Sequence, residues 1–374
     1  MTRSARAEVD LGLVAHNVRV LVDTVAPAAV CAVVKADGYG HGAVAVAEAA
    51  LAAGARWLAV ALPGEGAALR EAGITAPVLL LSEPETWEGA LDAGLTPTAY
   101  NADGIEALGR AAAERDAVVD VHLKVDTGMH RVGAPPASAV ERARAIAAHP
   151  ALRLAAVWTH CPVADEPANP FTDAQADRLD GVVAAIRAAG IDVPMVHAAN
   201  SAAALVHPRL RLDLVRCGIA VYGLAPSPAL RGVADLRPVL SLKARVSHVQ
   251  RVPAGDAVSY GLRRATPRDT VVATVPLGYA DGVPRRLGEL GATVLVGGVR
   301  RPLAGAVTMD QLMVDCGPGS TVAIGDEVVL LGRQGTGEIP AGEWAELLGT
   351  IEYEIVCGIG ARVPRVHLDP TIGA

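Results

Sequence analysis

The sequence predicts an α/β protein in which a TIM-type (β/α)8 barrel is followed by a mainly β C-terminal domain. In the first part of the chain, eight short apolar runs alternate with longer Ala-, Glu- and Arg-rich segments, which is typical of such a barrel. After Pro226-Ser227-Pro228 the runs become rich in Val, Thr and Leu, with Gly, Pro and Asp between them, which indicates strands and turns. No Gly-x-Gly-x-x-Gly follows a run, so an open doubly wound sheet is the weaker alternative. We expect the barrel over residues 1–230 and the β domain over residues 231–374.

Each expected strand is a short run of small or β-branched residues bounded by turn residues. The expected barrel strands are 29–34, 57–61, 78–81, 97–100, 119–125, 154–159, 195–198 and 213–216. The helices expected between them are 42–53, 64–72, 84–93, 103–114, 137–148, 173–189 and 201–206. In the second domain we expect strands in 239–252, 271–276, 293–300, 305–315 and 328–332, and one helix near 341–348.

Composition excludes several classes of protein. Of the 374 residues 51% are hydrophobic but only 3% aromatic, so the core is expected to consist mainly of Ala, Val and Leu. The net charge of -7 gives no reason to expect nucleic acid or anionic lipid as a partner. The most apolar stretch, 43–62, is interrupted by Glu48, Gly54 and Arg56, so we expect no membrane span.

The cysteines and the N-terminal residues bear on the compartment. The five cysteines are scattered and form no Cys-x-x-Cys pair, so neither a zinc site nor a disulfide framework is expected, and no other metal. The first six residues lead into Glu8 and Asp10 without an apolar segment, so we expect no secretory signal. Together these features favour a cytoplasmic protein.

Lys35 stands at the end of the apolar run 29–34 and is followed at once by the glycine-rich turn 36–42. A lysine there would place a primary amine at the rim of the sheet, partly removed from water. Desolvation lowers the pKa of an ammonium group and frees the nucleophilic amine. The alternative for a single lysine is a side chain that extends from the strand end into solvent, so Lys35 alone does not identify a site.

Polar residues follow five of the expected strands, at the ends where a barrel of this kind carries its active site. They are Lys35 after the first strand, Lys124, Asp126 and Arg131 after the fifth, Thr159 and His160 after the sixth, Asn200 and Ser201 after the seventh, and Arg216 and Gly218 after the eighth. Any one could be an ordinary loop residue, and Ser201 could cap the helix that follows. Because five strand ends present such groups to one rim, we expect an active site there.

Seven motifs strengthen this expectation by their order and spacing. They are Val33–Gly42, Lys124–Met129, Asn200–Ala203, Arg216–Ile219, Val258–Gly261, Gly278–Gly282 and Met309-Asp310. In these motifs the chain resembles the alanine racemase family over essentially its whole length. The resemblance implies an enzyme that binds pyridoxal 5'-phosphate (PLP), interconverts L-alanine and D-alanine with two bases and supplies D-alanine for peptidoglycan. It also implies a barrel plus a β domain, and a homodimer whose active sites are shared between subunits.

The resemblance assigns the catalytic residues. Lys35 would bind PLP covalently and act as a base on one face of the cofactor. Racemisation needs a second acid/base on the opposite face, and the matching residue is Tyr260. A tyrosine near its reference pKa of about 10 is a poor base at neutral pH. The family's hydrogen-bonded helper matches His160.

The remaining cofactor and substrate residues also follow from the resemblance. Arg216 would face the pyridine nitrogen, where a fixed positive charge disfavours protonation of that nitrogen. Arg131 and Met309 would bind the substrate, and Lys124 matches a position that is carbamylated in many relatives, which would give Arg131 an anionic partner. The residues implied to bind PLP are Lys35, Tyr39, Arg131, His160, Asn200, Ser201, Arg216, Gly218, Ile219 and Tyr353.

Three positions depart from the family pattern, and three alternatives stay open. Thr308 stands where Cys or Ser is common, Cys217 replaces a common proline, and Cys161-Pro162 is an unusual continuation of His160.

A racemase of another small amino acid such as serine is one alternative. A PLP-dependent decarboxylase of the same fold is a second, although it needs a carboxylate where this chain has Arg216. A PLP-carrier protein resembles an isolated barrel, and the domain with Tyr260 argues against it.

Overall fold

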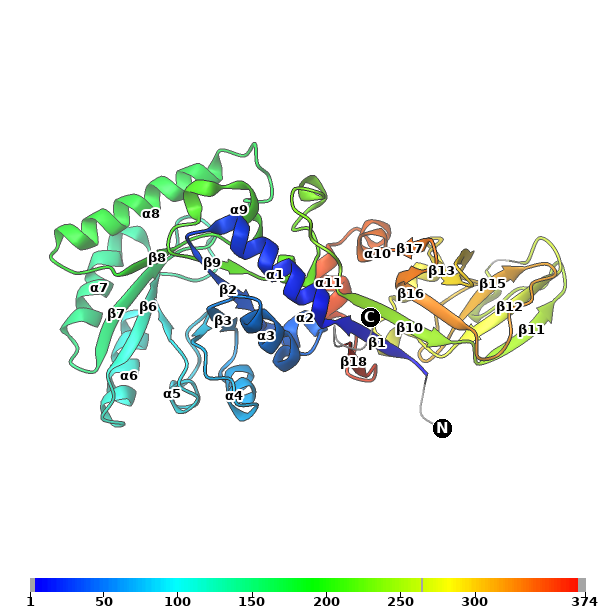
Figure 1. Cartoon of the computed structure of the whole chain (residues 1–374), viewed down its shortest axis with the longest axis horizontal. Coiled ribbons are helices and arrows are strands. Elements are labelled where there is room, and N and C mark those ends of the chain that lie inside the picture. Colours follow the sequence, from blue (N-terminus) through cyan, green and yellow to red (C-terminus); the bar gives the residue numbers. More distant parts are fainter. Residues whose placement is uncertain (1–3, 264, 369–374) are drawn as a thin grey trace. The chain divides into compact units, whose positions relative to one another are not determined.

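The computed structural model describes residues 4–263 and 265–368, which form two compact units (Figure 1). The barrel unit comprises residues 13–38 and 43–237. The β unit comprises the described residues within 1–12, 39–42 and 238–374. Because the N-terminal strand and the short segment 39–42 belong with the C-terminal residues, no single cut in the chain separates the two units.

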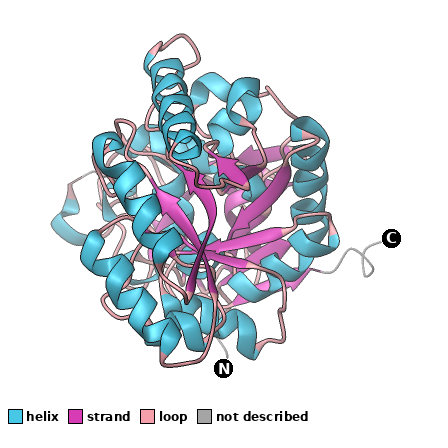
Figure 2. Cartoon of the chain, turned by 90° about the vertical axis from the view of Figure 1, so that its left-hand side faces the viewer, coloured by secondary structure: helices cyan, strands magenta, loops and turns pink. Residues whose placement is uncertain are grey.

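Eight parallel strands form the barrel, and each lies where the sequence predicts one. They are β2 (Ala29–Val33), β3 (Trp57–Val60), β4 (Val78–Leu80), β5 (Thr98–Ala99), β6 (Val119–Lys124), β7 (Leu152–Trp158), β8 (Met195–His197) and β9 (Leu214–Cys217). Hydrogen bonds join them in the orders β4-β3-β2-β9 and β5-β6-β7-β8. Backbone bonds at both junctions close the circle, among them those from Leu80 to the Thr96 carbonyl (2.9 Å) and from Arg216 to the Ala199 carbonyl (2.9 Å). Figure 2 shows the strands at the centre of the view with helices around them.

Helices follow the strands, as the sequence predicts. They are α3 (Ala43–Ala52), α4 (Pro63–Glu71), α5 (Glu88–Asp92), α6 (Ala102–Ala113), α7 (Ala139–Ala148), α8 (Phe171–Ala188) and α9 (Ser201–Val206), with the short 3-10 turns η1 (Pro136–Ser138), η2 (Pro208–Leu210), η3 (Ile219–Tyr222) and η4 (Pro228–Leu230). No element was expected before the first barrel strand, where the structure has α1 (Leu11–Val25). Its buried residues Val14, Val18, Leu21 and Val25 form an apolar stripe with helical spacing, so a signal was present.

The barrel core consists mainly of aliphatic side chains, as composition predicts. Leu58, Leu79, Leu123 and Val157 are fully buried on their strands. Burial of one such side chain contributes roughly 1.5–3 kcal/mol to folding. The large exception is Trp158, which lies fully buried at the end of β7 among polar side chains.

The turn after β2, α2 (Lys35–Gly40), is left-handed. Ala36, Asp37 and Tyr39 have φ values of 52°, 51° and 52°. Each such residue costs roughly 1–2 kcal/mol, because the side chain approaches the following carbonyl. Two side-chain acceptors hold the turn: Asp37 Oδ1 accepts from the Ala43 amide (2.9 Å) and Glu65 Oε1 accepts from the Ala36 amide (2.6 Å). The predicted glycine turn is therefore a fixed left-handed turn that begins at Lys35.

The β unit contains two sheets. Its strands are β1 (Arg6–Asp10), β10 (Leu240–Arg245), β11 (His248–Val252), β12 (Thr270–Val275), β13 (Thr293–Val296), β14 (Val299–Pro302), β15 (Leu312–Gly317), β16 (Glu327–Gln334), β17 (Gly337–Ile339) and β18 (Arg365–Leu368). One sheet has the order β14-β13-β16-β10-β1-β18 with β17 beside β16, and the other is β11-β12-β15. The helical elements are α10 (Ala341–Leu348), α11 (Glu352–Cys357), η5 (Tyr260–Leu262), η6 (Tyr279–Asp281) and η7 (Arg285–Gly288). The mainly β character and the helix near 341–348 are as predicted, whereas β1, β18 and α11 were not expected.

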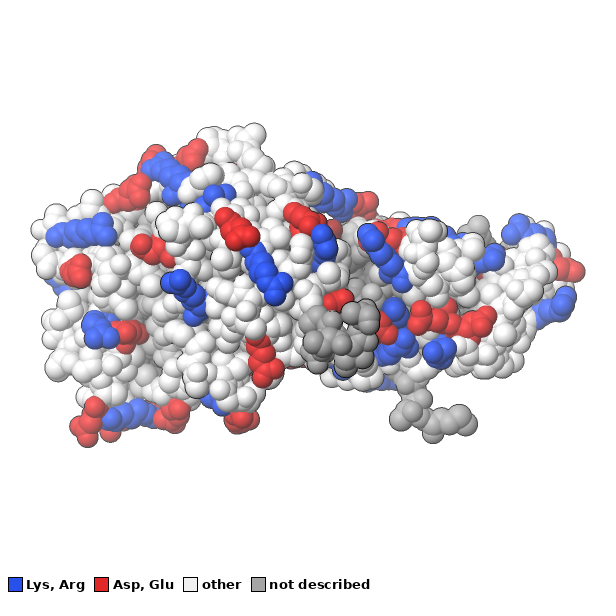
Figure 3. Space-filling view, viewed as in Figure 1, with Lys and Arg blue, Asp and Glu red and all other residues white. Residues whose placement is uncertain are grey.

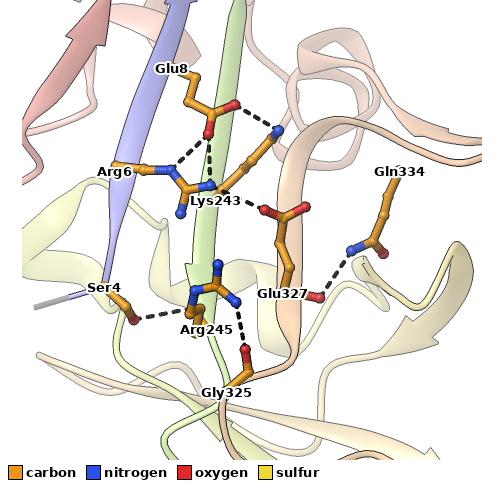
Figure 4. A network of polar contacts seen from close by, with 8 residues as sticks. All are labelled: Ser4, Arg6, Glu8, Lys243, Arg245, Gly325, Glu327 and Gln334. Carbon is orange, nitrogen blue, oxygen red and sulfur yellow. Dashed lines mark hydrogen bonds and ion pairs between the residues drawn. The ribbon is translucent and has the colours of Figure 1, made fainter.

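Charged residues tie β1 into this sheet (Figure 4). Glu8 accepts from Arg6 Nε (2.7 Å) and pairs with Lys243 Nζ (2.6 Å). Arg6 also donates to Glu327 Oε2 (3.1 Å). Burial raises the pKa of Glu8, but hydrogen bonds from Lys243 and Arg6 outweigh it, so the pKa of Glu8 lies below its usual value.

Replacing Glu8 by Gln should lower the free energy of unfolding at neutral pH by about 1–2 kcal/mol, because the partly buried Lys243 and Arg6 lose a charged acceptor. A carboxylate whose pKa is lowered on folding stabilises the fold above its unfolded pKa and stops doing so as the pH falls through its folded pKa. Urea denaturation should therefore show a difference between wild type and Glu8→Gln that shrinks in acid. The exposed pair Arg333–Glu338 supplies the control, Glu338→Gln, which should change little. A difference that is independent of pH would argue against this role of the charge.

The described residues contain no helix long and apolar enough to cross a membrane. They also contain no group of three or more His, Cys, Asp or Glu side chains arranged to hold a metal ion.

On the face drawn in Figure 3, basic and acidic residues are interspersed. This face therefore carries charge of mixed sign.

Candidate active site

The predicted polar residues of the barrel unit lie at the carboxyl ends of its strands. Lys124 is the last residue of β6, Arg216 is the next-to-last residue of β9, and both are buried; Ser201 is buried at the start of α9. Lys35, His160 and Asn200 are half-buried, whereas Arg131 is exposed. Of the chain's three lysines, Lys35, Lys124 and Lys243, two are therefore found at this rim.

Arg216 is the centre of the cluster. Its guanidinium donates to the carbonyls of Thr159 (2.7 Å) and Ala198 (2.9 Å), contacts His160 Nδ1 (3.3 Å), and lies 4.3 Å from the centre of the Trp158 ring. No carboxylate among the described residues forms an ion pair with it. Burial lowers the pKa of Arg216 to about 10, which leaves it charged at neutral pH. The site thus holds a buried, oriented positive charge.

Two histidines continue from Arg216, and the sequence did not assign them a role. Arg216 Nη1 donates to His197 Nδ1 (2.7 Å), and His197 Nε2 lies 3.1 Å from His122 Nδ1. Because a guanidinium only donates, the proton of neutral His197 must be on Nε2, from which it donates to His122. Burial lowers the pKa of His122 to about 3 and that of His197 well below its usual value, so both rings are neutral. Trp158 stacks on His197 with ring centroids 5.3 Å apart.

Lys124 lies in an unusual environment for an amine. Its Nζ is 4.4 Å from the centre of the Trp158 ring. Burial, with the positive charges of Arg216, Arg131 and Lys35, lowers the pKa of Lys124 to about 7 despite the opposing effect of Asp126. A large fraction of this side chain is therefore the neutral, nucleophilic amine at neutral pH.

His160 is kept neutral by its surroundings. Burial lowers its pKa, and the charges of Arg216, Arg131, Lys124 and Lys35 lower it further, to well below the usual value. Since Nδ1 faces the Arg216 guanidinium (3.3 Å), which offers no acceptor, the ring proton is on Nε2.

The ends of β8 and β9 form a group of donors. Ser201 Oγ accepts from the amides of Gly218 (2.9 Å) and Ala220 (3.4 Å), so its own O–H can donate elsewhere. The amide of Ile219 donates to no acceptor among the described residues. A hydroxyl and an amide that still have protons to donate suit an anion such as a phosphate. The helix cap is Asn200, not Ser201: Asn200 Oδ1 accepts from the Ala203 amide (3.0 Å), while its Nδ2 donates to the Cys161 carbonyl (3.0 Å).

The other predicted site residues belong to the β unit. The rings of Tyr39 and Tyr353 lie with centroids 6.2 Å apart. Tyr260 is 71% exposed and Met309 is 53% exposed. Thr308, the departure from the family pattern, donates its hydroxyl to the Gln311 carbonyl (2.8 Å) and so closes the turn that carries Met309.

Family models match both parts of the chain: the alanine racemase N-terminal domain over residues 9–226 and the alanine racemase C-terminal domain over residues 239–367. The chain belongs to the alanine racemase family. The alanine racemase of Symbiobacterium thermophilum is 47% identical over 367 residues, which are 98% of this chain and 97% of the relative.

Solved structures of the alanine racemase fold agree. The alanine racemase of a D-cycloserine-producing Streptomyces lavendulae matches with a TM-score of 0.93 and 40% identity over 98% of each chain. A histidine racemase from Leuconostoc mesenteroides matches with a TM-score of 0.89 and 28% identity over 98% of each chain. The fold therefore serves racemases named for different amino acids.

Proposed function

We propose that this protein interconverts L-alanine and D-alanine with PLP as cofactor. Membership of the alanine racemase family supports the reaction. The observation that carries the proposal within the site is Arg216, a buried cation with no carboxylate partner among the described residues. A decarboxylase of this fold would need a carboxylate there, so Arg216 favours racemisation.

The residues present fit PLP. Ser201 and the Ile219 amide have protons to donate to its phosphate, with Gly218 allowing close approach of the backbone and Tyr39 and Tyr353 as further phosphate ligands. Arg131 would bind the phenolic oxygen and the substrate carboxylate, the latter together with Met309. His160 and Asn200 complete the cofactor residues. When bound, PLP withdraws electrons from the amino acid and makes its Cα proton acidic.

Two residues would move the proton. Lys35 would hold the cofactor until the amino group of the substrate replaces it, and its amine would then take or return the Cα proton on one side, while Tyr260 would do the same on the other. His160 supports the Tyr260 role, because its Nε2–H can donate to the tyrosine oxygen and orient it. Neutral His160 has this proton available because its Nδ1 faces the Arg216 guanidinium, which has no acceptor.

The exposure of Tyr260 and Met309 supports a homodimer. Tyr260, Leu262, Tyr279 and Met309 are large apolar side chains that one chain alone leaves exposed in the β unit. We place them at the active site of a neighbouring subunit, so that activity needs the dimer. The protein would act in the cytoplasm, where D-alanine is made for peptidoglycan.

The direct test is to incubate purified protein, loaded with PLP, with L-alanine and to follow D-alanine by chiral chromatography. L-serine and L-histidine run in parallel resolve the substrate class, because the fold also serves a histidine racemase. Alanine should give the highest kcat/KM. Release of carbon dioxide without change of configuration would overturn the proposal in favour of a decarboxylase.

Lys124 should react reversibly with carbon dioxide to form a carbamate, which would give Arg131 an anionic partner. Only a neutral amine reacts, and the lowered pKa makes the neutral form abundant near pH 7, so uptake should rise through about this pH. NMR of protein equilibrated with isotope-labelled bicarbonate should show one carbamate signal that Lys124→Ala abolishes. Lys243, paired with Glu8, is the internal control. A signal that persists in Lys124→Ala would assign the modification elsewhere.

A further inference from the structure

Gln175 of α8 is a buried amide that reaches two groups at the rim of the barrel. Its Nε2 donates to Thr127 Oγ1 (3.0 Å) and to the His160 carbonyl (3.1 Å). The opposite orientation of the amide would turn Oε1 toward the His160 carbonyl, and two acceptors would then face each other. The contacts therefore fix which end of the amide points to the site.

The segment Thr159–His160 is held from two sides. Arg216, on β9, donates to the Thr159 carbonyl (2.7 Å) and contacts His160 Nδ1 (3.3 Å). Gln175, on the surrounding helix, holds the carbonyl of the next residue. Without Gln175 the segment around His160 keeps only its bonds to residues at the strand ends, from Arg216 to the Thr159 carbonyl and from Asn200 to the Cys161 carbonyl.

The same helix also holds the end of β6. Thr127 Oγ1 bonds to Thr159 Oγ1 (2.7 Å), and Arg178, one turn after Gln175, donates to the Thr127 carbonyl (2.7 Å). Glycine at position 128 lets Arg178 come this close to the backbone, because a Cβ there would lie 2.6 Å from Phe171 Cζ and 2.9 Å from Arg178 Nη1. Side chains of α8 thus hold both the segment that leads to Arg131 and the segment that contains His160.

We propose that Gln175 is a positioning residue for racemisation, which fixes His160 so that its Nε2–H meets the Tyr260 oxygen. The proposal rests on the proposed function, since that function gives His160 its partner. Gln175 touches neither substrate nor cofactor in this account. Misplacement of a supporting group by about 1 Å costs up to about 10²-fold in rate.

The main variant is Gln175→Met, which keeps the side-chain length and removes the donor. We expect kcat to fall by about 10-fold with little change in KM, since orientation and not binding is impaired. A pH limb of kcat/KM should also shift in this variant, because the proton-transfer group that accepts from His160 loses a well-placed hydrogen bond. The matched control is Thr172→Val on the same helix, whose buried hydroxyl has no partner among the described residues. It should retain wild-type rates and pH profile.

A second readout does not depend on activity. Hydrogen exchange and imidazole NMR of the cofactor-free protein should show a more mobile Thr159–Cys161 segment and altered His160 signals in Gln175→Met. If wild type fails to racemise any amino acid, the proposed function is refuted. The exchange and NMR measurements still test whether Gln175 holds the His160 segment in place. Should Gln175→Met not fold, Thr127→Val removes one acceptor, and Thr127→Ser should restore the wild-type behaviour. A uniform loss of rate with an unshifted pH limb and unchanged exchange would reduce Gln175 to a purely structural residue and overturn the proposal.

Discussion

Lys35→Ala should abolish racemisation, with a loss of at least about 10⁴-fold, because it removes both the amine that attaches PLP and one of the two proton-transfer groups. The fold should persist, since Lys35 is only half-buried and lies after the residues of β2 that pair with β3 and β9. Borohydride reduction of the wild type followed by peptide mapping should find the cofactor on Lys35.

The chain offers a clean control for this experiment, because it contains only two other lysines. Lys243→Ala, in the β unit, should keep its activity although it weakens the contact with Glu8. Circular dichroism should show the same folded content in Lys35→Ala and in wild type. Cofactor recovered on Lys124 would refute the assignment of Lys35.

Tyr260→Phe should lower kcat by about 10²–10⁴-fold, the usual contribution of a general acid/base. The ring is largely exposed in the single chain, so loss of its hydroxyl removes no buried contact within that chain and should leave its fold intact. Incorporation of deuterium from heavy water into L-alanine should slow in parallel, because Tyr260 is the group proposed to take its proton.

Tyr100→Phe, which removes a different tyrosine hydroxyl at the end of β5, serves as the control and should behave as wild type. If Tyr260→Phe exchanged the L-alanine proton at the wild-type rate, Tyr260 would not be the second base. A loss of rate that disappears at higher protein concentration would instead indicate a role in assembly.

The barrel could be predicted because its strands share one sequence pattern, a short run of mostly apolar residues. A run such as 29–34 is apolar on both faces and ends at a polar residue, so position along the chain already indicates the rim. The same reasoning located Lys35, Lys124, His160 and Arg216, each of which lies within two residues of the carboxyl end of a strand.

Contacts across the barrel could not be predicted in this way. His122 and His197 are 75 residues apart, His122 inside β6 and His197 at the last position of β8, and no local pattern distinguishes either from a satisfied core histidine. Gln175 lies in a helix of ordinary composition, and only the packed structure shows that its amide points inward. Strands β1 and β18 pair with each other across almost the whole length of the chain, so no local signal marks them.

In the left-handed turn after β2, the backbone angles favour D-amino acids and glycine over L-amino acids. An L-residue at Ala36 or Asp37 adopts the backbone angles that a D-residue adopts without cost, and glycine is indifferent. Semisynthesis with D-alanine at position 36 should therefore stabilise the segment that delivers Lys35, whereas a β-branched L-residue there should be rejected. The backbone beside the proposed reactive lysine therefore has the angles that D-residues prefer, although it is built from L-residues and glycine.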